Sequence, residues 1–202
     1  MARAALITLL ALLVLAPLAR ADGDPASDYL LTQPAFLPPD VVIPKSDADD
    51  LTSTLAAAKQ KGYEVRVAVI GTRYDMGSVG ALFRKPKEYA RFLGQELRFV
   101  YKGKLLVVMP NGYGVSENGK PLPAAAKVVA PLPPPGTGGA ALAQGATSAV
   151  RKLAAASGVQ VQAAPSSGSS SSNVATIGGV IAIVVVLAVV AAFFVRPRER
   201  LG

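Results

Sequence analysis

The stretches Val65-Arg66-Val67-Ala68-Val69-Ile70 and Leu105-Leu106-Val107-Val108-Met109 decide the fold class of this chain. Both are short and rich in aliphatic residues, and a turn-forming residue, Gly71 or Pro110, follows each of them, which is typical of β-strands. The second stretch contains no polar residue, so it predicts a strand that is covered on both faces. A strand of this kind belongs to a sheet that lies inside an α/β domain.

Three helical patterns accompany these strands. The first begins at Ser46, whose hydroxyl can cap a helix, and ends at Gly62. The second begins at Pro86, which suits a first helical turn, and the third has apolar residues at helical spacing between residues 142 and 153. The alternation of strands and helices predicts a small α/β sandwich with a short central sheet and about three helices.

Other segments of the same region show no helical pattern. Residues from Tyr29 to Ile43 read as extended chain interrupted by prolines, and residues 120–139, rich in Pro and Gly, read as irregular. Between the predicted strand at 105–109 and this irregular segment, Asn111-Gly112 and Glu117-Asn118-Gly119 are turn sequences. They predict a short returning strand at residues 113–115.

A long apolar run near the end of the chain predicts a transmembrane helix. It extends from Val174 to Val195 and contains neither a charge nor a proline. At the helical rise of 1.5 Å per residue, about 22 residues cover roughly 33 Å, enough to cross a bilayer. Arg196, Arg198 and Arg200 follow at once, and we expect them to anchor the tail at anionic headgroups on the cytoplasmic side.

The first residues, 1–21, have the pattern of a secretory signal. Arg3 precedes a short apolar stretch, Pro17 breaks it, and Ala19-Arg20-Ala21 fits the small-x-small cleavage rule. An uncleaved signal anchor is the alternative. Both ends of the chain therefore predict a single-pass cell-membrane protein, with an extracytoplasmic domain at 22–160, a Ser/Gly-rich linker at 161–173 and a cytoplasmic tail at 196–202.

Composition excludes several classes of function. The chain has neither cysteine nor histidine, so Cys-His and Ser-His-Asp catalysis and the usual zinc sites are excluded, and we predict no cofactor. The formal net charge is +8, but nucleic acid is not an expected partner of an exported, tethered domain. The basic segment 84–104 could bind anionic lipid or cell-wall polymer, and solvated helix faces explain it as well.

Some residues are candidates for a site. Arg73 and Asp75 follow the predicted strand at 65–70, where α/β folds commonly place ligands, and are our candidate ligand-binding residues; a plain connecting loop is the alternative. The acidic cluster at 47–50 could bind a divalent cation, but it also suits the positive end of a helix dipole. In the predicted span, small residues four apart, such as Gly178 and Ala182, would allow a weak homodimer.

The order of elements from about Tyr29 to Leu153 resembles the TPM domain family. The resemblance rests on Tyr29-Leu30-Leu31 before the first helix, on GYEVRVAVI at 62–70, on KLLVVM at 104–109 leading into glycines, and on AALAQG at 140–145. It implies a secreted or lumenal α/β domain, often tethered by one span. Some members are credited with phosphatase activity and with metal binding through acidic groups, and others are accessory factors of membrane protein complexes.

The chain departs from the family at its acidic positions. Thr32 or Gln33 stands where members tend to have an aspartate, and Lys102-Gly103-Lys104 stands where an acidic residue is usual. We therefore assign no catalytic or metal-binding role to any residue. We expect a non-catalytic domain that acts by protein interaction, as an accessory factor of a membrane or envelope complex. A metal-dependent, phosphatase-like hydrolase is the alternative, and lipid or wall-polymer binding through segment 84–104 is a further one.

Overall fold

The structure, a computed structural model, describes residues 23–162. The predicted signal at 1–21, the linker from residue 163 on, the predicted span at 174–195 and the tail with Arg196, Arg198 and Arg200 lie outside the described residues. Within residues 23–162, no helix combines the length and the apolar character needed to cross a membrane.

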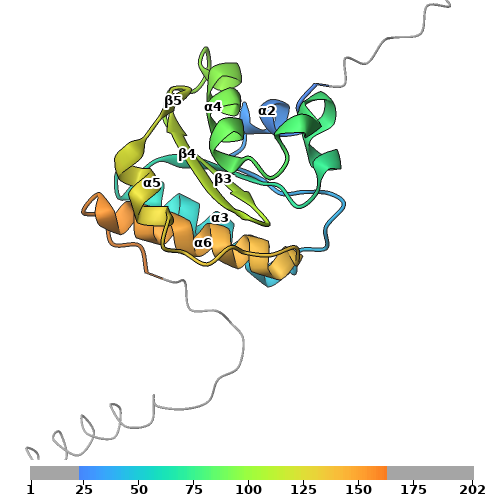
Figure 1. Cartoon of the computed structure of the whole chain (residues 1–202). Helices are drawn as coiled ribbons and strands as arrows, with labels where there is room; N and C mark the ends of the chain where they lie inside the picture. Colours follow the sequence, from blue (N-terminus) through green and yellow to red (C-terminus); the bar gives the residue numbers. More distant parts are fainter. Residues whose placement is uncertain (1–22, 163–202) are drawn as a thin grey trace, which may run out of the picture. The chain divides into compact units, whose positions relative to one another are not determined.

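A five-stranded mixed sheet forms the centre of the domain (Figure 1). Its strands lie side by side in chain order: β1 (Ala35–Phe36), β2 (Val65–Val69), β3 (Lys104–Met109), β4 (Gly112–Glu117) and β5 (Lys120–Pro121). The first three are parallel, and β4 and β5 continue antiparallel to their neighbours. The two apolar stretches of the sequence are thus the central strands β2 and β3, and the predicted α/β class is confirmed.

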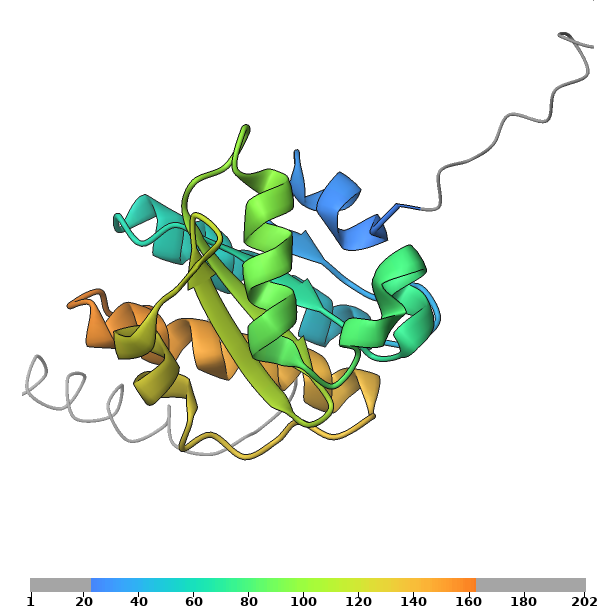
Figure 2. The same ribbon diagram turned by 45° about the horizontal axis from the view of Figure 1, so that its top comes forward.

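Helices cover both faces of the sheet, so two separate cores form (Figures 1 and 2). One face carries α3 (Lys45–Gln60), α5 (Pro123–Val129) and α6 (Gly139–Ala156), and the other carries α2 (Pro25–Leu30), the 3-10 helix η1 (Arg73–Leu82) and α4 (Pro86–Leu97). Successive residues of β3 point to opposite cores, as Leu106 and Leu105 do. The prediction that this strand is covered on both faces is therefore confirmed.

The two parallel crossovers lie on opposite faces. α3 joins β1 to β2 on one side, and α4 joins β2 to β3 on the other. Because these strands advance in one direction across the sheet, connections on opposite faces have opposite hands. Nearly all such crossovers in proteins are right-handed, so this fold contains one of the rare exceptions. As a result, α4 lies on the face opposite α3, α5 and α6.

Several sequence expectations need correction. The segment at Tyr29 is not extended, because Asp24 accepts a hydrogen bond from the Ala26 amide and Pro25 occupies the first turn, so α2 forms there. Residues 120–139 contain α5, which also starts at a proline, Pro123. With these, the described residues hold five α-helices and η1 where about three helices were predicted.

The predicted helix at Ser46 starts one residue earlier, at Lys45, with Pro44 rather than Ser46 at the cap position. The Asn118-Gly119 turn forms as predicted, with positive φ at both residues, as a tight hairpin turn requires. The returning strand is longer than its predicted extent of 113–115.

Helix α4 packs directly against β4 because glycine removes the side chains between them. A Cβ added at Gly114 would lie 1.9 Å from the Pro86 carbonyl oxygen, and one added at Gly94 would lie 2.7 Å from the Gly119 amide nitrogen. Between these points the Ser116 hydroxyl, which is buried, donates a hydrogen bond of 2.5 Å to the carbonyl of Ala90. Figure 2 shows α4 lying over the β3–β4 hairpin.

Replacement of Gly114 by alanine should therefore push α4 away from the sheet. We expect Gly114→Ala to lower the free energy of unfolding by about 1–3 kcal/mol, the usual cost of overpacking. Urea unfolding of the full-length protein in nonionic detergent, followed by far-UV circular dichroism, measures the change. Gly138→Ala is the matched control, because its added Cβ would meet nothing closer than 4.0 Å. Equal midpoints for the two variants would contradict this packing.

Candidate functional site

The edge of β4 is open along half of the strand. β4 pairs with β3 over its whole length, but with β5 only at Ser116 and Glu117. The amide of Ile70 donates to the carbonyl of Val108 at 2.9 Å, so the backbone groups of Val108 point toward β2. Tyr113 of β4 lies opposite Val108. In antiparallel pairing, two opposite residues point their backbone groups either toward each other or both away from each other. Tyr113 therefore points its N–H and C=O away from β3.

Outward and inward groups alternate along an antiparallel strand, so the backbone groups of Val115 also point away from β3. Tyr113 has no strand partner on this side among the residues that the structure describes. Val115 lies opposite Leu122, and the pairing of Ser116 with Pro121, which has no N–H, directs the Leu122 amide to the Val115 carbonyl. The side chains of Tyr113 and Val115 are 9% and 6% exposed and belong to the core beneath α5 and α6. The unpaired part of the edge is therefore centred on Tyr113, and the pairing with the β5 segment begins at Val115.

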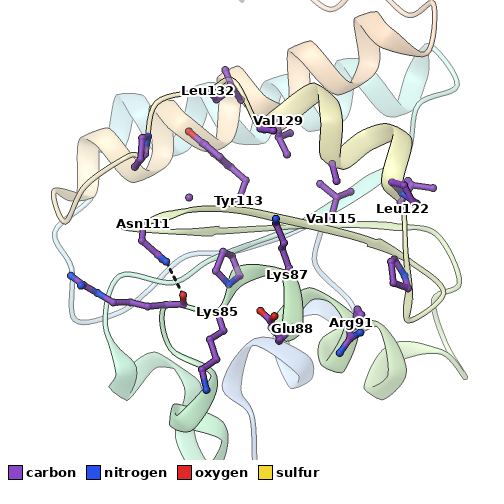
Figure 3. Close-up of a pocket in the computed structure, with 18 residues that line it drawn as sticks. Lys85, Lys87, Glu88, Arg91, Asn111, Tyr113, Val115, Leu122, Val129 and Leu132 are labelled. Carbon is purple, nitrogen blue, oxygen red and sulfur yellow. Dashed lines mark hydrogen bonds between the residues drawn. The ribbon is translucent and has the colours of Figure 1, made fainter.

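A groove of about 810 Å³ runs along this open edge (Figure 3). One wall is α5 with the loop that follows it, and its side chains are largely apolar, among them Leu122, Val129 and Leu132. The other wall is the start of α4, and its side chains are largely charged. The charged residues of this wall are Arg84, Lys85, Lys87, Glu88 and Arg91.

The α4 wall carries a positive potential. Its four cations have one acidic neighbour on the wall, Glu88, and the salt bridges found among residues 23–162 all involve other residues. α4 also begins here, at Pro86, without a side-chain cap, so the positive end of its dipole faces the groove. An anionic group entering the groove would therefore meet fixed positive charge.

Two hydrogen bonds hold the groove at the β3–β4 turn. The side-chain amide of Asn111 donates to the Arg84 carbonyl at 2.7 Å, which ties the turn to the segment before α4 (Figure 3). The Tyr113 hydroxyl donates to the Pro133 carbonyl at 3.2 Å, which ties β4 to the loop after α5. Burial raises the pKa of Tyr113, so this hydroxyl stays protonated and remains a donor at neutral pH.

The predicted ligand-binding pair, Arg73 and Asp75, is placed on η1, away from the groove. Arg73 is exposed, whereas Asp75 is buried and its Oδ2 accepts hydrogen bonds from the amides of Gly71 and Thr72 at 2.9 and 2.6 Å. This carboxylate thus caps the start of η1, and its Oδ1 has no partner among the described residues. Neither residue lines a described pocket, and their role in binding stays a prediction.

The acidic cluster at 47–50 is engaged in local contacts. Asp47 accepts from Gln144 at 3.0 Å, and Asp49 forms an exposed pair with Lys45 at 2.5 Å. A small pocket of about 240 Å³ between α3 and α6 combines members of the cluster with Arg151 and Lys152. Within residues 23–162, no three or more His, Cys, Asp or Glu side chains gather as a metal site would require.

The basic segment 84–104 is divided by the fold. Its first half forms the wall of the groove, while Lys104 pairs with Glu117 at 3.2 Å. The loop between α4 and β3 instead presents Phe99 and Val100, which are 82% and 64% exposed. The segment therefore makes a charged wall and a separate apolar loop.

A buried carboxylate, Asp24, was not singled out in the sequence. It is 5% exposed, and its Oδ1 accepts hydrogen bonds from the Tyr89 hydroxyl at 2.7 Å and from the Ala26 amide at 3.2 Å. Burial raises its pKa from 3.8 to about 6, although both hydrogen bonds oppose the shift. Only its position before Pro25, typical of a helix cap, marks it in the sequence.

No protein-family model, no curated protein and no solved structure matches this chain. The groove at the β4 edge is therefore interpreted from its own geometry.

The raised pKa of Asp24 predicts a pH-dependent stability. In the folded state the Asp24 carboxyl has a pKa of about 6, whereas its ordinary value is 3.8. The folded state therefore binds this proton more tightly than the unfolded state, and the free energy of unfolding falls as the pH rises through that interval. Asp24→Asn keeps the oxygen acceptor for Tyr89 and cannot ionise. We expect the variant to gain about 1–3 kcal/mol over the wild type between pH 4 and pH 7, with no further gain above.

Urea unfolding of both full-length proteins at several pH values from 4 to 8 measures this difference. Asp40→Asn, at an exposed position that takes no part in the Asp24 shift, is the control and should follow the wild-type curve. Wild-type and Asp24→Asn curves that run parallel over the whole interval would show that Asp24 does not ionise in the folded protein at the expected pKa.

Proposed function

We propose that this chain is a membrane-tethered extracytoplasmic domain that binds a partner protein and has no catalytic chemistry of its own. The tether and the outside location come from the apolar run at 174–195, the basic tail and the signal pattern at 1–21. The observation that carries the binding role is the groove along the open edge of β4. The resemblance to TPM domains suggests that the partner belongs to a membrane or envelope complex.

The composition of the groove suits binding. An unpaired strand edge is a template for another chain, and proteins normally cover or blunt such edges. Here the edge is instead flanked by an apolar wall and a basic wall, which together provide area and orientation for a ligand. Its titratable side chains include a single carboxylate, Glu88, so the groove lacks the paired acid and base of a hydrolytic site.

The hydrolase alternative has less support. It needs Asp75 and the cluster at 47–50 to share one metal, but the described residues contain no such grouping. Asp75 caps η1, and the members of the cluster contact Gln144 and Lys45. Each group therefore has a structural role that explains its position.

A second candidate function, contact with anionic lipid, is favoured by the loop after α4. Phe99 and Val100 are exposed at this loop, and Arg98 and Lys102 flank them. Insertion of the two apolar side chains into a membrane interface would contribute about 2–4 kcal/mol, and each flanking cation about 1 kcal/mol. We place this contact at residues 98–102 and not along the whole segment 84–104.

Site-specific photo-crosslinking in native membranes tests both functions in one experiment. A photoreactive residue is introduced at Lys87 in the groove, at Phe99 in the loop and, as a matched control, at Ser53, which is exposed on α3. We expect Lys87 to capture one protein of defined mass that Ser53 does not capture. Lipid adducts at Phe99 would support the second function.

Capture of no protein at Lys87 above the Ser53 background would contradict the proposed interaction role of the groove. Absence of lipid adducts at Phe99 would contradict the membrane contact of the loop, and it would leave the groove unaffected.

A further inference from the structure

We infer that the groove receives an extended segment of the partner in which acidic and apolar residues alternate, and that this segment joins the sheet as a strand beside β4. The inference rests on the proposed function and specifies the chemistry of the partner. It follows from the direction of the backbone groups at the β4 edge, from the difference between the apolar wall and the charged wall of the groove, and from the charges of the chain's own segments.

The backbone provides the first element of recognition. Tyr113 directs its N–H and C=O into the groove, two residues before Val115, where the pairing with the β5 segment begins. β5 already pairs with the neighbouring residues Ser116 and Glu117, so an added segment would continue the line of β5. Main-chain hydrogen bonds would supply affinity, as in other cases of strand addition.

The walls provide the second element. Along an added strand, successive side chains point to opposite faces of the sheet. One face here is bounded by α4 with its cations, and the other by α5 with Leu122 and Val129. A segment that alternates acidic and apolar residues would therefore place every acidic side chain against Lys87 and Arg91, and every apolar side chain against α5.

The length of the open edge limits the segment. Between Gly112 and Gly114 the strand has no partner on its outer side, and an added strand rises about 3.4 Å per residue. The paired part of the segment is accordingly short, on the order of three to five residues. Such a segment is the size of a linear motif in an extended tail or loop.

The charges of this chain argue against its own segments as the occupant. Residues 163–173 contain no charged side chain, and the tail at 196–202 is basic, so neither complements the α4 wall. A second copy that paired edge to edge through β4 would bring two sets of cations, Arg84 to Arg91, close together. Like charges facing each other at an interface disfavour that arrangement.

Peptide binding to the full-length protein in lipid nanodiscs tests the inference. The probe is a fluorescein-labelled octapeptide that alternates valine and glutamate; the comparison peptides are a four-valine, four-glutamate block of the same composition and a valine–lysine alternation. We expect binding of the alternating acidic peptide only. Lys87→Glu combined with Arg91→Glu should weaken it at least tenfold.

Lys61→Glu combined with Lys152→Glu makes the same charge change at exposed positions outside the groove and is the matched control, with an expected change of less than twofold. Backbone pairing is tested with two N-methylated probes, one methylated at the valine amides and one at the glutamate amides. Along an added strand, successive amides point alternately toward β4 and away from it. One methylated probe should therefore lose binding, and the other should keep it.

Equal binding of the block or the lysine peptide, equal effects of both methylation patterns, or no binding at millimolar peptide would overturn strand addition. In those cases the basic wall would serve to protect the β4 edge from unwanted pairing. Capture of a protein at Lys87 in membranes would still support the proposed function. Failure of strand addition can therefore be distinguished from failure of the protein-binding role.

Discussion

The contact between the backbones of α4 and β4 determines the geometry of the rest of the domain. It exists because Gly114 and Gly94 carry no side chains where helix and strand approach, and Ser116 bridges the gap with a hydrogen bond to Ala90. Through this contact the first turn of α4 is held at the edge of the sheet. The cations of that turn and the open half of β4 consequently face the same groove.

The two cores on either side of the sheet stabilise this arrangement without any disulfide, since the chain has no cysteine. The central strands β2 and β3 contribute to both cores, and α3 and α6 cover the face opposite α4. The domain therefore presents a rigid frame around an unpaired strand edge. A rigid frame suits recognition of an extended segment, because little of the binding free energy is lost in ordering the receptor.

The central part of the fold could be predicted from the sequence because its signals are local. The runs at 65–70 and 105–109 are apolar and short, and the Asn118-Gly119 turn has its own chemistry. α2 was missed because it spans a single helical turn and a half, where a cap and a proline outweigh hydrophobic periodicity. α5 was missed because proline and glycine dominate the composition of the segment around it.

The groove could not be predicted, because it depends on pairing partners rather than on residue types. Whether Tyr113 points its amide inward or outward is set by the register with β3, and no pattern in the sequence reports that register. The cations of α4 were recognised as basic residues, but segment 84–104 reads as one unit until the fold separates Lys87 from Lys102.

Residue-resolved hydrogen exchange of the backbone amides along β4 tests the open edge most directly. We expect the amides of Gly114 and Ser116, which are directed toward β3, to exchange slowly, and those of Tyr113 and Val115, which are directed into the groove, to exchange much faster. Uniformly slow exchange across these four residues would show that the edge is already paired, and it would contradict the groove as a site for an added strand.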